Sequence, residues 1–214
     1  MNPLSAFAKF YQEGGPFMHA ILATGVAILA LTAERFWVIS RAARVNHGKL
    51  TRDVQQRVAK GDLPAAVDIC RRVKGPVAAV AQAILSRHNA GEESLQNAAD
   101  GAATIVLPPL SRRLPYLNVL ANVATLLGLL GTIFGLTTAF SAVSAADPAQ
   151  RSSFLAVGIA QALNTTAFGL IIAVPTLILH SFLVSKVEGV VESIDEASVR
   201  LIDAVTRKGS ANAA

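Results

Sequence analysis

The sequence predicts an all-α integral membrane protein with three transmembrane helices that continue into long cytoplasmic helices. The chain is 52% hydrophobic and 15% charged, whereas soluble domains carry about 25% charged residues. Three predicted spans lie at residues 17–39, 114–146 and 152–185, and the uncharged apolar run of the first is 16–33. Each is long enough for the roughly 20 residues that a helix needs to cross the hydrocarbon core.

The N-terminal part predicts a periplasmic or interfacial segment, 1–16, followed by a first span, 17–39. A cleaved signal peptide is the rival interpretation, because Ala30-Leu31-Thr32-Ala33 loosely resembles a cleavage site. The apolar run is long for a signal peptide, however, and Lys9 is the single basic residue before it. Trp37, which follows the run, suits an anchor at the membrane interface. We therefore expect a retained span.

The next region, 40–113, predicts a cytoplasmic loop built from short, Ala-rich helices. Glycine and proline interrupt the helical pattern at 61–64, 75–76 and 89–91, and Pro108-Pro109 marks a bend before the second span. Such short helices bury little surface alone. We expect them to pack on one another and on neighbouring subunits.

The last two spans, 114–146 and 152–185, are separated by the short turn 147–151. A turn of this length predicts an antiparallel hairpin. After it, 186–208 has an apolar face and a charged face, which indicates an amphipathic helix extending into the cytoplasm. The small polar residues of 209–214 predict a disordered tail.

Basic residues give the orientation. The segment 35–113 holds thirteen of the nineteen Lys and Arg, while the turn 147–151 and the N-terminal segment 1–16 hold one each. The positive-inside rule places the loop and the C-terminus in the cytoplasm, and the N-terminus in the periplasm. The net charge of +5 comes with no nucleic-acid recognition motif, so no nucleic-acid partner is expected.

No pattern of catalytic or metal-binding residues is present. The sequence has no G-x-S-x-G, no H-E-x-x-H and no paired carboxylates in the spans, and its four histidines lack the spacing of metal ligands. Cys70 cannot form an intrachain disulfide because it is the one cysteine. Arg71 and Arg72 beside it could lower its pKa, but a small half-buried helical residue is the favoured interpretation. We expect no enzyme, cofactor or metal.

Small and hydroxyl residues form one stripe on each of the last two spans. At 100° per residue, the second span groups Ala121, Thr125, Gly128, Thr132, Gly135 and Ala139, and the third groups Gly158, Ala162, Thr165, Thr166, Gly169, Ala173 and Thr176. Close helix packing explains any single Gly or Ala, including the Gly131-x-x-x-Gly135 pair. The number of hydroxyls, with Gln161 at the edge, favours a lumen or a polar partner helix.

The apolar runs of the three spans contain no Asp, Glu, Lys or Arg, and only His19 and His180 could titrate there. A proton-coupled protein needs a group that gains and loses protons at membrane depth. If this chain handles protons, another chain must supply the carrier.

Three stretches resemble the ExbB/TolQ/MotA family of proton-channel stator subunits, most closely its ExbB/TolQ branch. They read G-G-P-F-M-H-A-I-L at 14–22, L-L-G-L-L-G-T-I-F-G-L at 126–136 and G-I-A-Q-A-L-N-T-T-A-F-G-L-I-I-A-V-P at 158–175. The resemblance implies a five-subunit ring in the bacterial inner membrane, whose lumen holds a dimer of a single-span ExbD/TolR/MotB-type partner with a membrane Asp. It implies proton-driven mechanical work on the envelope, serving TonB-type uptake, Tol-type maintenance or gliding, with a TonB-like or motility partner.

The resemblance also implies site residues. Thr132 and Thr166 match the threonines that face the partner's Asp, and further pore-lining positions are Thr165, Thr125 and Gln161. Positions of the packing and pore stripe are Gly128, Gly131, Gly135, Ala162, Gly169 and Pro175, the last expected to kink its helix.

Two positions depart from the family pattern. Gln161 stands where Glu is common, and an amide cannot carry a charge, so this position is expected to shape the pore rather than to relay protons. Thr125 stands where many relatives have Pro, which predicts a straighter second span. The alternative is a non-energised membrane scaffold of the same architecture that docks cytoplasmic partners.

Overall fold

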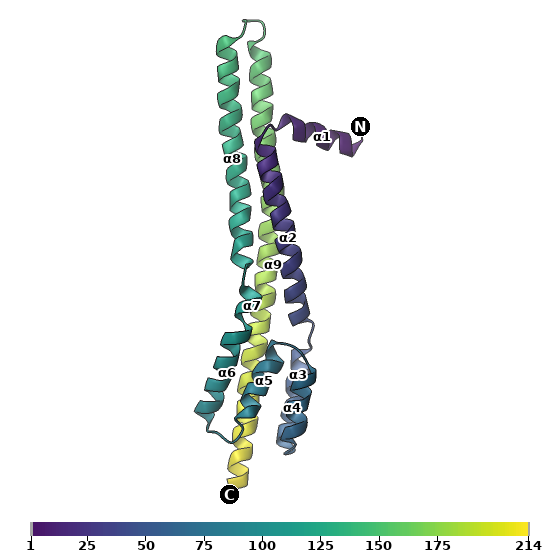
Figure 1. Cartoon of the computed structure of the whole chain (residues 1–214), viewed down its shortest axis with the longest axis vertical. Helices are drawn as coiled ribbons and strands as arrows, with labels where there is room; N and C mark the ends of the chain where they lie inside the picture. The colour runs from purple at the N-terminus through teal and green to yellow at the C-terminus, as the bar shows by residue number, and fades with distance from the viewer. Residues whose placement is uncertain (1, 214) are drawn as a thin grey trace. The chain divides into compact units, whose positions relative to one another are not determined.

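The computed structural model describes the backbone of residues 2–213 and the side chains up to Arg207, and all of its regular structure is helical. The helices are α1 Pro3–Glu13, α2 Phe17–Ala43, α3 His47–Ala59, α4 Leu63–Arg72, α5 Pro76–Ser86, α6 Glu92–Val106, α7 Pro108–Ser111, α8 Leu114–Ala145 and α9 Arg151–Ala213 (Figure 1). This confirms the predicted all-α class.

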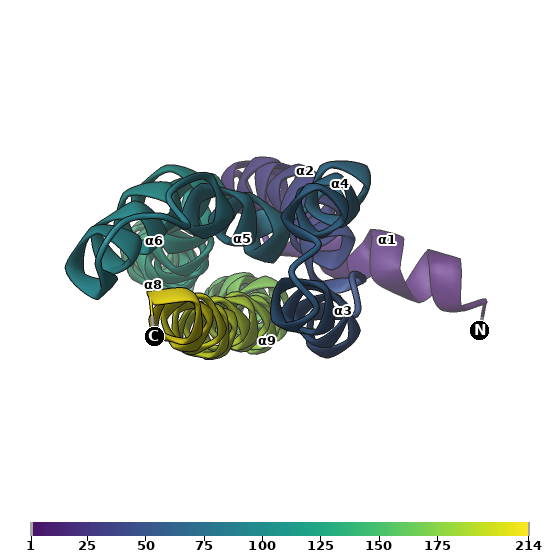
Figure 2. The ribbon, with the colours of Figure 1, turned by 90° about the horizontal axis from the view of Figure 1, so that it is seen from below.

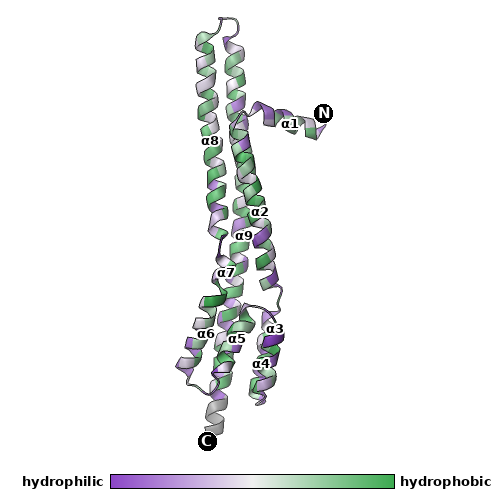
Figure 3. Cartoon of the chain, viewed as in Figure 1, coloured by the Kyte–Doolittle hydropathy of each residue, from purple (hydrophilic) through white to green (hydrophobic). Residues whose placement is uncertain are grey.

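Three of these helices, α2, α8 and α9, are long and apolar enough to cross a membrane. Figure 3 shows apolar residues predominating along α2 and α8. The predicted third span, 152–185, and the predicted amphipathic helix, 186–208, are parts of one uninterrupted helix, α9. The predicted tail, 209–214, lies outside the residues whose side chains are described.

The chain forms two compact units. The span unit comprises Met1–Glu34 and Arg113–Ser181, and the loop unit comprises Arg35–Arg112 and Phe182–Ala214. The boundary therefore cuts α2 after Glu34 and α9 after Ser181.

In the span unit, α8 and α9 form the predicted antiparallel hairpin along a seam of small residues. The buried residues of the seam on α8 are Ala121, Ala124, Gly128, Gly131, Gly135 and Ala139. Its glycines are needed for close backbone contact, since a Cβ added to Gly135 would lie 3.1 Å from the amide nitrogen of Ala162. A Cβ on Gly169 would lie 2.7 Å from the carbonyl oxygen of Ala124. The hairpin is thus held by van der Waals contact between backbones, as expected in lipid.

In the loop unit, α3 packs on α4, α4 on α5 and α5 on α6, a succession that Figure 2 also shows. The helices begin where the sequence provides caps: Asn46 accepts a hydrogen bond from the amide of Lys49 (2.9 Å), and Asp62 accepts one from the amide of Ala65 (3.2 Å). The predicted breaks at 61–64, 75–76 and 89–91 all separate helices. The apolar face of the last part of α9 is buried, as at Val190, Ile194 and Leu201.

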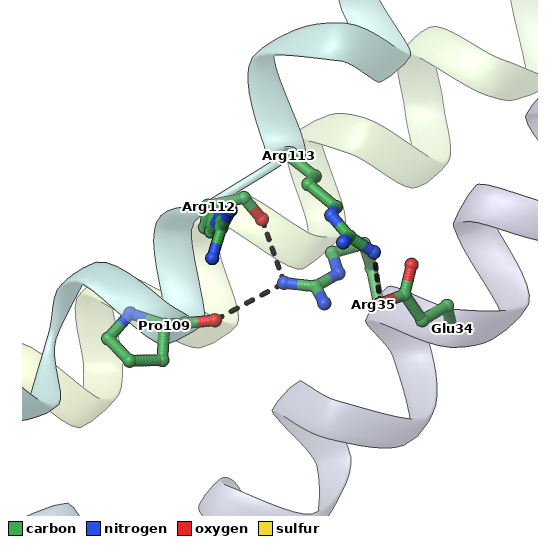
Figure 4. Close-up of polar contacts among 5 residues, drawn as sticks. All are labelled: Glu34, Arg35, Pro109, Arg112 and Arg113. Atoms are coloured by element: carbon green, nitrogen blue, oxygen red, sulfur yellow. Dashed lines mark hydrogen bonds and ion pairs between the residues drawn. The ribbon is translucent and has the colours of Figure 1, made fainter.

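The predicted bend at Pro108-Pro109 becomes the short helix α7 and a left-handed residue, Arg113, with φ of 71°. Two neighbouring side chains of α2 hold the two sides of this bend (Figure 4). Arg35 donates hydrogen bonds to the carbonyls of Pro109 (3.2 Å) and Arg112 (2.8 Å) in the loop unit. Glu34 forms an ion pair with Arg113 (2.6 Å) in the span unit. These contacts offset the strain of a non-glycine residue in the left-handed region.

The seam predicts opposite effects for two glycine substitutions on α9. Gly169→Ala forces the Ala124 backbone away and should lower the free energy of unfolding by about 1–3 kcal/mol. Gly189→Ala meets no atom within 4 Å and should raise it by about 0.5–1 kcal/mol through helix propensity. Denaturant titration of the purified protein in detergent measures both. A Gly169→Ala protein as stable as the wild type would contradict close packing at the seam.

Candidate functional site

The two threonines that the resemblance singled out lie close to one another on the α8–α9 hairpin. Thr166 of α9 donates a hydrogen bond across the hairpin to the carbonyl of Gly128 (3.1 Å). Thr132 lies one turn further along α8 and donates to the carbonyl of Leu129 in its own helix (2.6 Å). Both side chains are half-buried. They therefore flank the seam at the same level.

These hydroxyls are suited to bind a carboxyl group but not to replace one. A hydroxyl has one proton and two lone pairs. Each proton is used on a backbone carbonyl, so the lone pairs remain to accept a hydrogen bond from a neutral carboxyl. To donate to an ionised carboxylate, the hydroxyl must rotate away from its carbonyl. Residues 114–146 and 152–185 contain no Asp or Glu, so these two segments supply no carboxyl of their own to the hydroxyls.

Thr165 lies inside the subunit, which differs from its predicted position on a pore wall. It is completely buried, and its hydroxyl contacts the carbonyls of Gly14 (2.9 Å) and Gln161 (2.7 Å). Gly14 belongs to the turn between α1 and α2. Thr165 therefore holds this turn against α9.

Gln161 of α9 contacts the same turn between α1 and α2. Its side chain is half-buried and touches Gly15, where an added Cβ would collide with the amide group. Gly15 has a φ of 75°, so both the backbone conformation and the space require glycine. The polar run of α9 thus contacts the G-G-P turn of its own chain.

The remaining predicted residues separate into two groups. Buried in the seam are Gly128, Gly131, Gly135, Ala162 and Gly169. Thr125 is exposed and donates to the carbonyl of Ala121 (3.2 Å). Pro175 is also exposed, and the helix α9 continues through it. The stripe predicted on α8 therefore covers two adjacent faces of the helix. The Gly and Ala residues form the buried face, and Thr125 and Thr132 lie on the face beside it.

The sequence interpretation missed an aromatic cluster that anchors α1. The rings of Phe7, Phe10 and Tyr11 lie around Phe168 of α9, with centroids 6.0 to 6.3 Å from its ring. The hydroxyl of Tyr11 forms a hydrogen bond with Nδ1 of His19 (2.5 Å). The aromatic residues at 7, 10 and 11 were the available signal, because they share one face of a short helix.

No group of three or more His, Cys, Asp or Glu among the described residues could hold a metal ion. His47, at the start of α3, has its pKa lowered by burial, an effect that the carbonyl of Ala42 partly opposes. Burial raises the pKa of the Cys70 thiol to about 11. The neighbouring arginines do not activate this thiol, because Arg72 pairs with Asp68 (2.6 Å) and Arg71 is exposed.

A family model described as the MotA/TolQ/ExbB proton channel family matches residues 72–196, more than half of the chain. The chain belongs to this family. The match covers the hairpin with Thr132 and Thr166 and the helices α5, α6 and α7 of the loop unit. The family is one of proton channels that energise transport and is not a known class of enzyme.

Similar curated proteins place the chain in the ExbB/TolQ branch of the family. A putative ExbB homologue of Methanothermobacter thermautotrophicus is 24% identical over 91% of this chain and 69% of its own length. The putative biopolymer transport protein ExbB-like 3 of Synechocystis is 29% identical over 78% of this chain and 80% of its own. The Tol-Pal system protein TolQ of Haemophilus influenzae is 38% identical over 38% of this chain and 35% of its own length. With its three apolar helices, the chain is a multi-pass inner-membrane protein.

The raised pKa of Cys70 gives a test of the loop unit's packing. Between pH 7 and 9 the alkylation rate should rise about tenfold per pH unit without levelling, whereas an exposed thiol levels near its pKa of about 8.5. Because the folded-state pKa is raised, the protonated thiol stabilises the fold at low pH, and this contribution is lost as the pH rises towards 11.

The control for this measurement is Cys70→Ser combined with Ser86→Cys, which places one thiol at an exposed position. Iodoacetamide labelling, followed by mass spectrometry, gives both rates. Levelling near pH 8.5 in the wild type would contradict a buried Cys70.

Proposed function

We propose that this chain is the ring subunit of an inner-membrane proton-conducting motor that works with an ExbD/TolR-like partner. The complex converts the proton-motive force into mechanical work on the cell envelope. The observation that carries the proposal is the pair Thr132 and Thr166, whose half-buried hydroxyls flank one level of the α8–α9 hairpin in a region without acids of its own.

In this proposal the partner's membrane Asp carries the proton. The lone pairs of Thr132 and Thr166 receive the neutral carboxyl, and rotation of either hydroxyl solvates the ionised one. Charge in a low-dielectric site needs such hydrogen bonds, because an unpaired carboxylate there is costly. Gln161 relays no proton, since an amide does not titrate, and its contact with Gly15 supports a role in shaping the wall.

The proposed assembly is a homo-oligomer, a pentameric ring, in which α8 and α9 line the inside. Many large apolar side chains of the span unit are exposed in the single chain, including Leu126 (62%), Ile133 (57%), Leu163 (64%) and Ile178 (66%). Such a surface requires lipid or other subunits as cover. The basic residues of 35–113 support a cytoplasmic loop unit and C-terminus, with a periplasmic N-terminus.

The process that the motor drives is TonB-type uptake, Tol-type envelope maintenance or gliding motility. The relatives named as biopolymer transport or Tol-Pal proteins support the first two. The alternative, a non-energised scaffold that docks cytoplasmic partners, is supported by the uncharged Gln161 and by the burial of the small residues within the subunit.

The two hydroxyls give a direct test of the proposed proton path. Thr132→Ala combined with Thr166→Ala should reduce proton flux and the energised output by at least tenfold, as for loss of groups that stabilise a charged intermediate. Proton uptake into vesicles that contain the complex with its partner measures the flux.

The matched control is Thr137→Ala, which removes an exposed hydroxyl that bonds only its own helix, to Ile133 (2.7 Å). Co-purification of the partner shows that the complex still assembles. Wild-type flux in the double variant would refute the proposed site.

A substitution in the partner separates the motor from the scaffold. In the same vesicles, changing the partner's membrane Asp to Asn should abolish flux while the ring still binds the partner, because the apolar runs of this chain contain no carboxyl. A scaffold would show no flux with either partner, and unchanged flux with Asn would place the carrier on this chain.

A further inference from the structure

The end of α2 in the loop unit carries a pocket that neither the fold nor the proton path requires. Its volume is about 330 Å³, and it is lined by Phe36, Trp37, Ser40, Arg41 and Arg44. We refer to it as the α2 pocket. All of its residues lie within two and a half turns of α2 or directly after its end.

The two cations of the α2 pocket have no acidic partner among the described residues. Ion pairs do occupy other exposed arginines of the loop unit, such as Arg57 with Asp62 and Arg200 with Glu196. Arg41 and Arg44 are exposed and three residues apart, so their guanidinium groups project from the same side of the helix. Ser40 adds a hydroxyl between them and the aromatic residues.

The aromatic wall of the pocket is exposed as well. Phe36 is 52% and Trp37 66% exposed, and the guanidinium carbon of Arg41 lies 5.8 Å from the centre of the Trp37 ring. This cation–π contact holds Arg41 over the ring and leaves its N–H edge free to donate. An apolar ring beside unpaired cations fits a ligand that is part hydrocarbon and part anion.

The position in the sequence indicates the source of such a ligand. Trp37 follows the apolar run of α2, and Arg41 and Arg44 come one and two turns later. Tryptophan is enriched at the level of lipid headgroups, and basic residues just beyond a span attract anionic lipids. Arginine also binds phosphate by two parallel hydrogen bonds.

We propose that the α2 pocket binds the phosphodiester headgroup of an anionic phospholipid. Arg41 and Arg44 donate to the phosphate oxygens, Ser40 contributes a further hydrogen bond, and the acyl chain runs along Trp37 and Phe36. The site is independent of Thr132 and Thr166, so its failure would leave the proposed proton path untouched.

Trp37 provides the test, because it is the single tryptophan of the chain. The full-length protein is reconstituted in phosphatidylcholine bilayers that contain either brominated phosphatidylglycerol or brominated phosphatidylcholine at equal mole fraction. Bromine quenches a tryptophan that it contacts. We expect phosphatidylglycerol to compete for the site roughly fivefold better than phosphatidylcholine.

Arg41→Gln combined with Arg44→Gln should reduce this preference to about one. The matched control, Arg52→Gln with Arg71→Gln, removes the same charge from two exposed arginines outside the pocket and should keep the preference. Inorganic phosphate, compared with chloride at the same ionic strength, should not relieve the quenching.

Three results would overturn the proposal. Equal quenching by the two lipids in the wild type, or none by either, would show that no anionic lipid occupies the pocket. A preference that survives in the Arg41 and Arg44 variant would place the lipid elsewhere. Relief of quenching by inorganic phosphate would assign the pocket to free phosphate.

Discussion

The close approach of the α8 and α9 backbones is the constraint on which the rest of the span unit depends. No hydrophobic effect drives two apolar helices together in lipid, so contact area and hydrogen bonds must do so. Glycine at 128, 135 and 169 brings backbone atoms into contact. At that separation the hydroxyl of Thr166 reaches the carbonyl of Gly128 (3.1 Å). A wider spacing would break this bond and move the hydroxyls that flank the seam.

The polar run of α9 satisfies itself mainly within its own chain. Thr165 binds the carbonyl of Gly14, and Gln161 packs on Gly15. Together with the rings around Phe168, these contacts fix where α1 meets α2. Burying polar groups in a membrane segment is tolerated here because the carbonyl of Gly14 in the turn accepts a hydrogen bond. Polarity at membrane depth therefore does not by itself mark a pore.

Local rules were enough to predict the helices, but not the direction in which their side chains point. Charge-free length and Gly or Pro breaks correctly gave the three apolar helices and the joints of the loop unit. Thr125 and Thr132 were grouped with the buried glycines because, at about 100° per residue, they lie only about 60° and about 40° from Gly128 around the helix. The contact of Thr165 with Gly14 could not be predicted locally, because the two residues lie 151 positions apart. Cys70 is likewise governed by burial against other helices rather than by its neighbours in sequence.

The two threonines are consequently not equivalent as probes of a proton path. Thr166 bridges two helices, so removing its hydroxyl costs packing as well as about 1 kcal/mol of hydrogen bonding. Thr132 bonds only a carbonyl of its own helix, a contact that contributes little to stability. A loss of flux from Thr132→Ala alone, in a hairpin of unchanged stability, would therefore support the proposed contact between this hydroxyl and a partner's carboxyl. On α9, Thr166→Ser is the control for Thr166→Ala, because it keeps the bridging hydroxyl and removes only the methyl group.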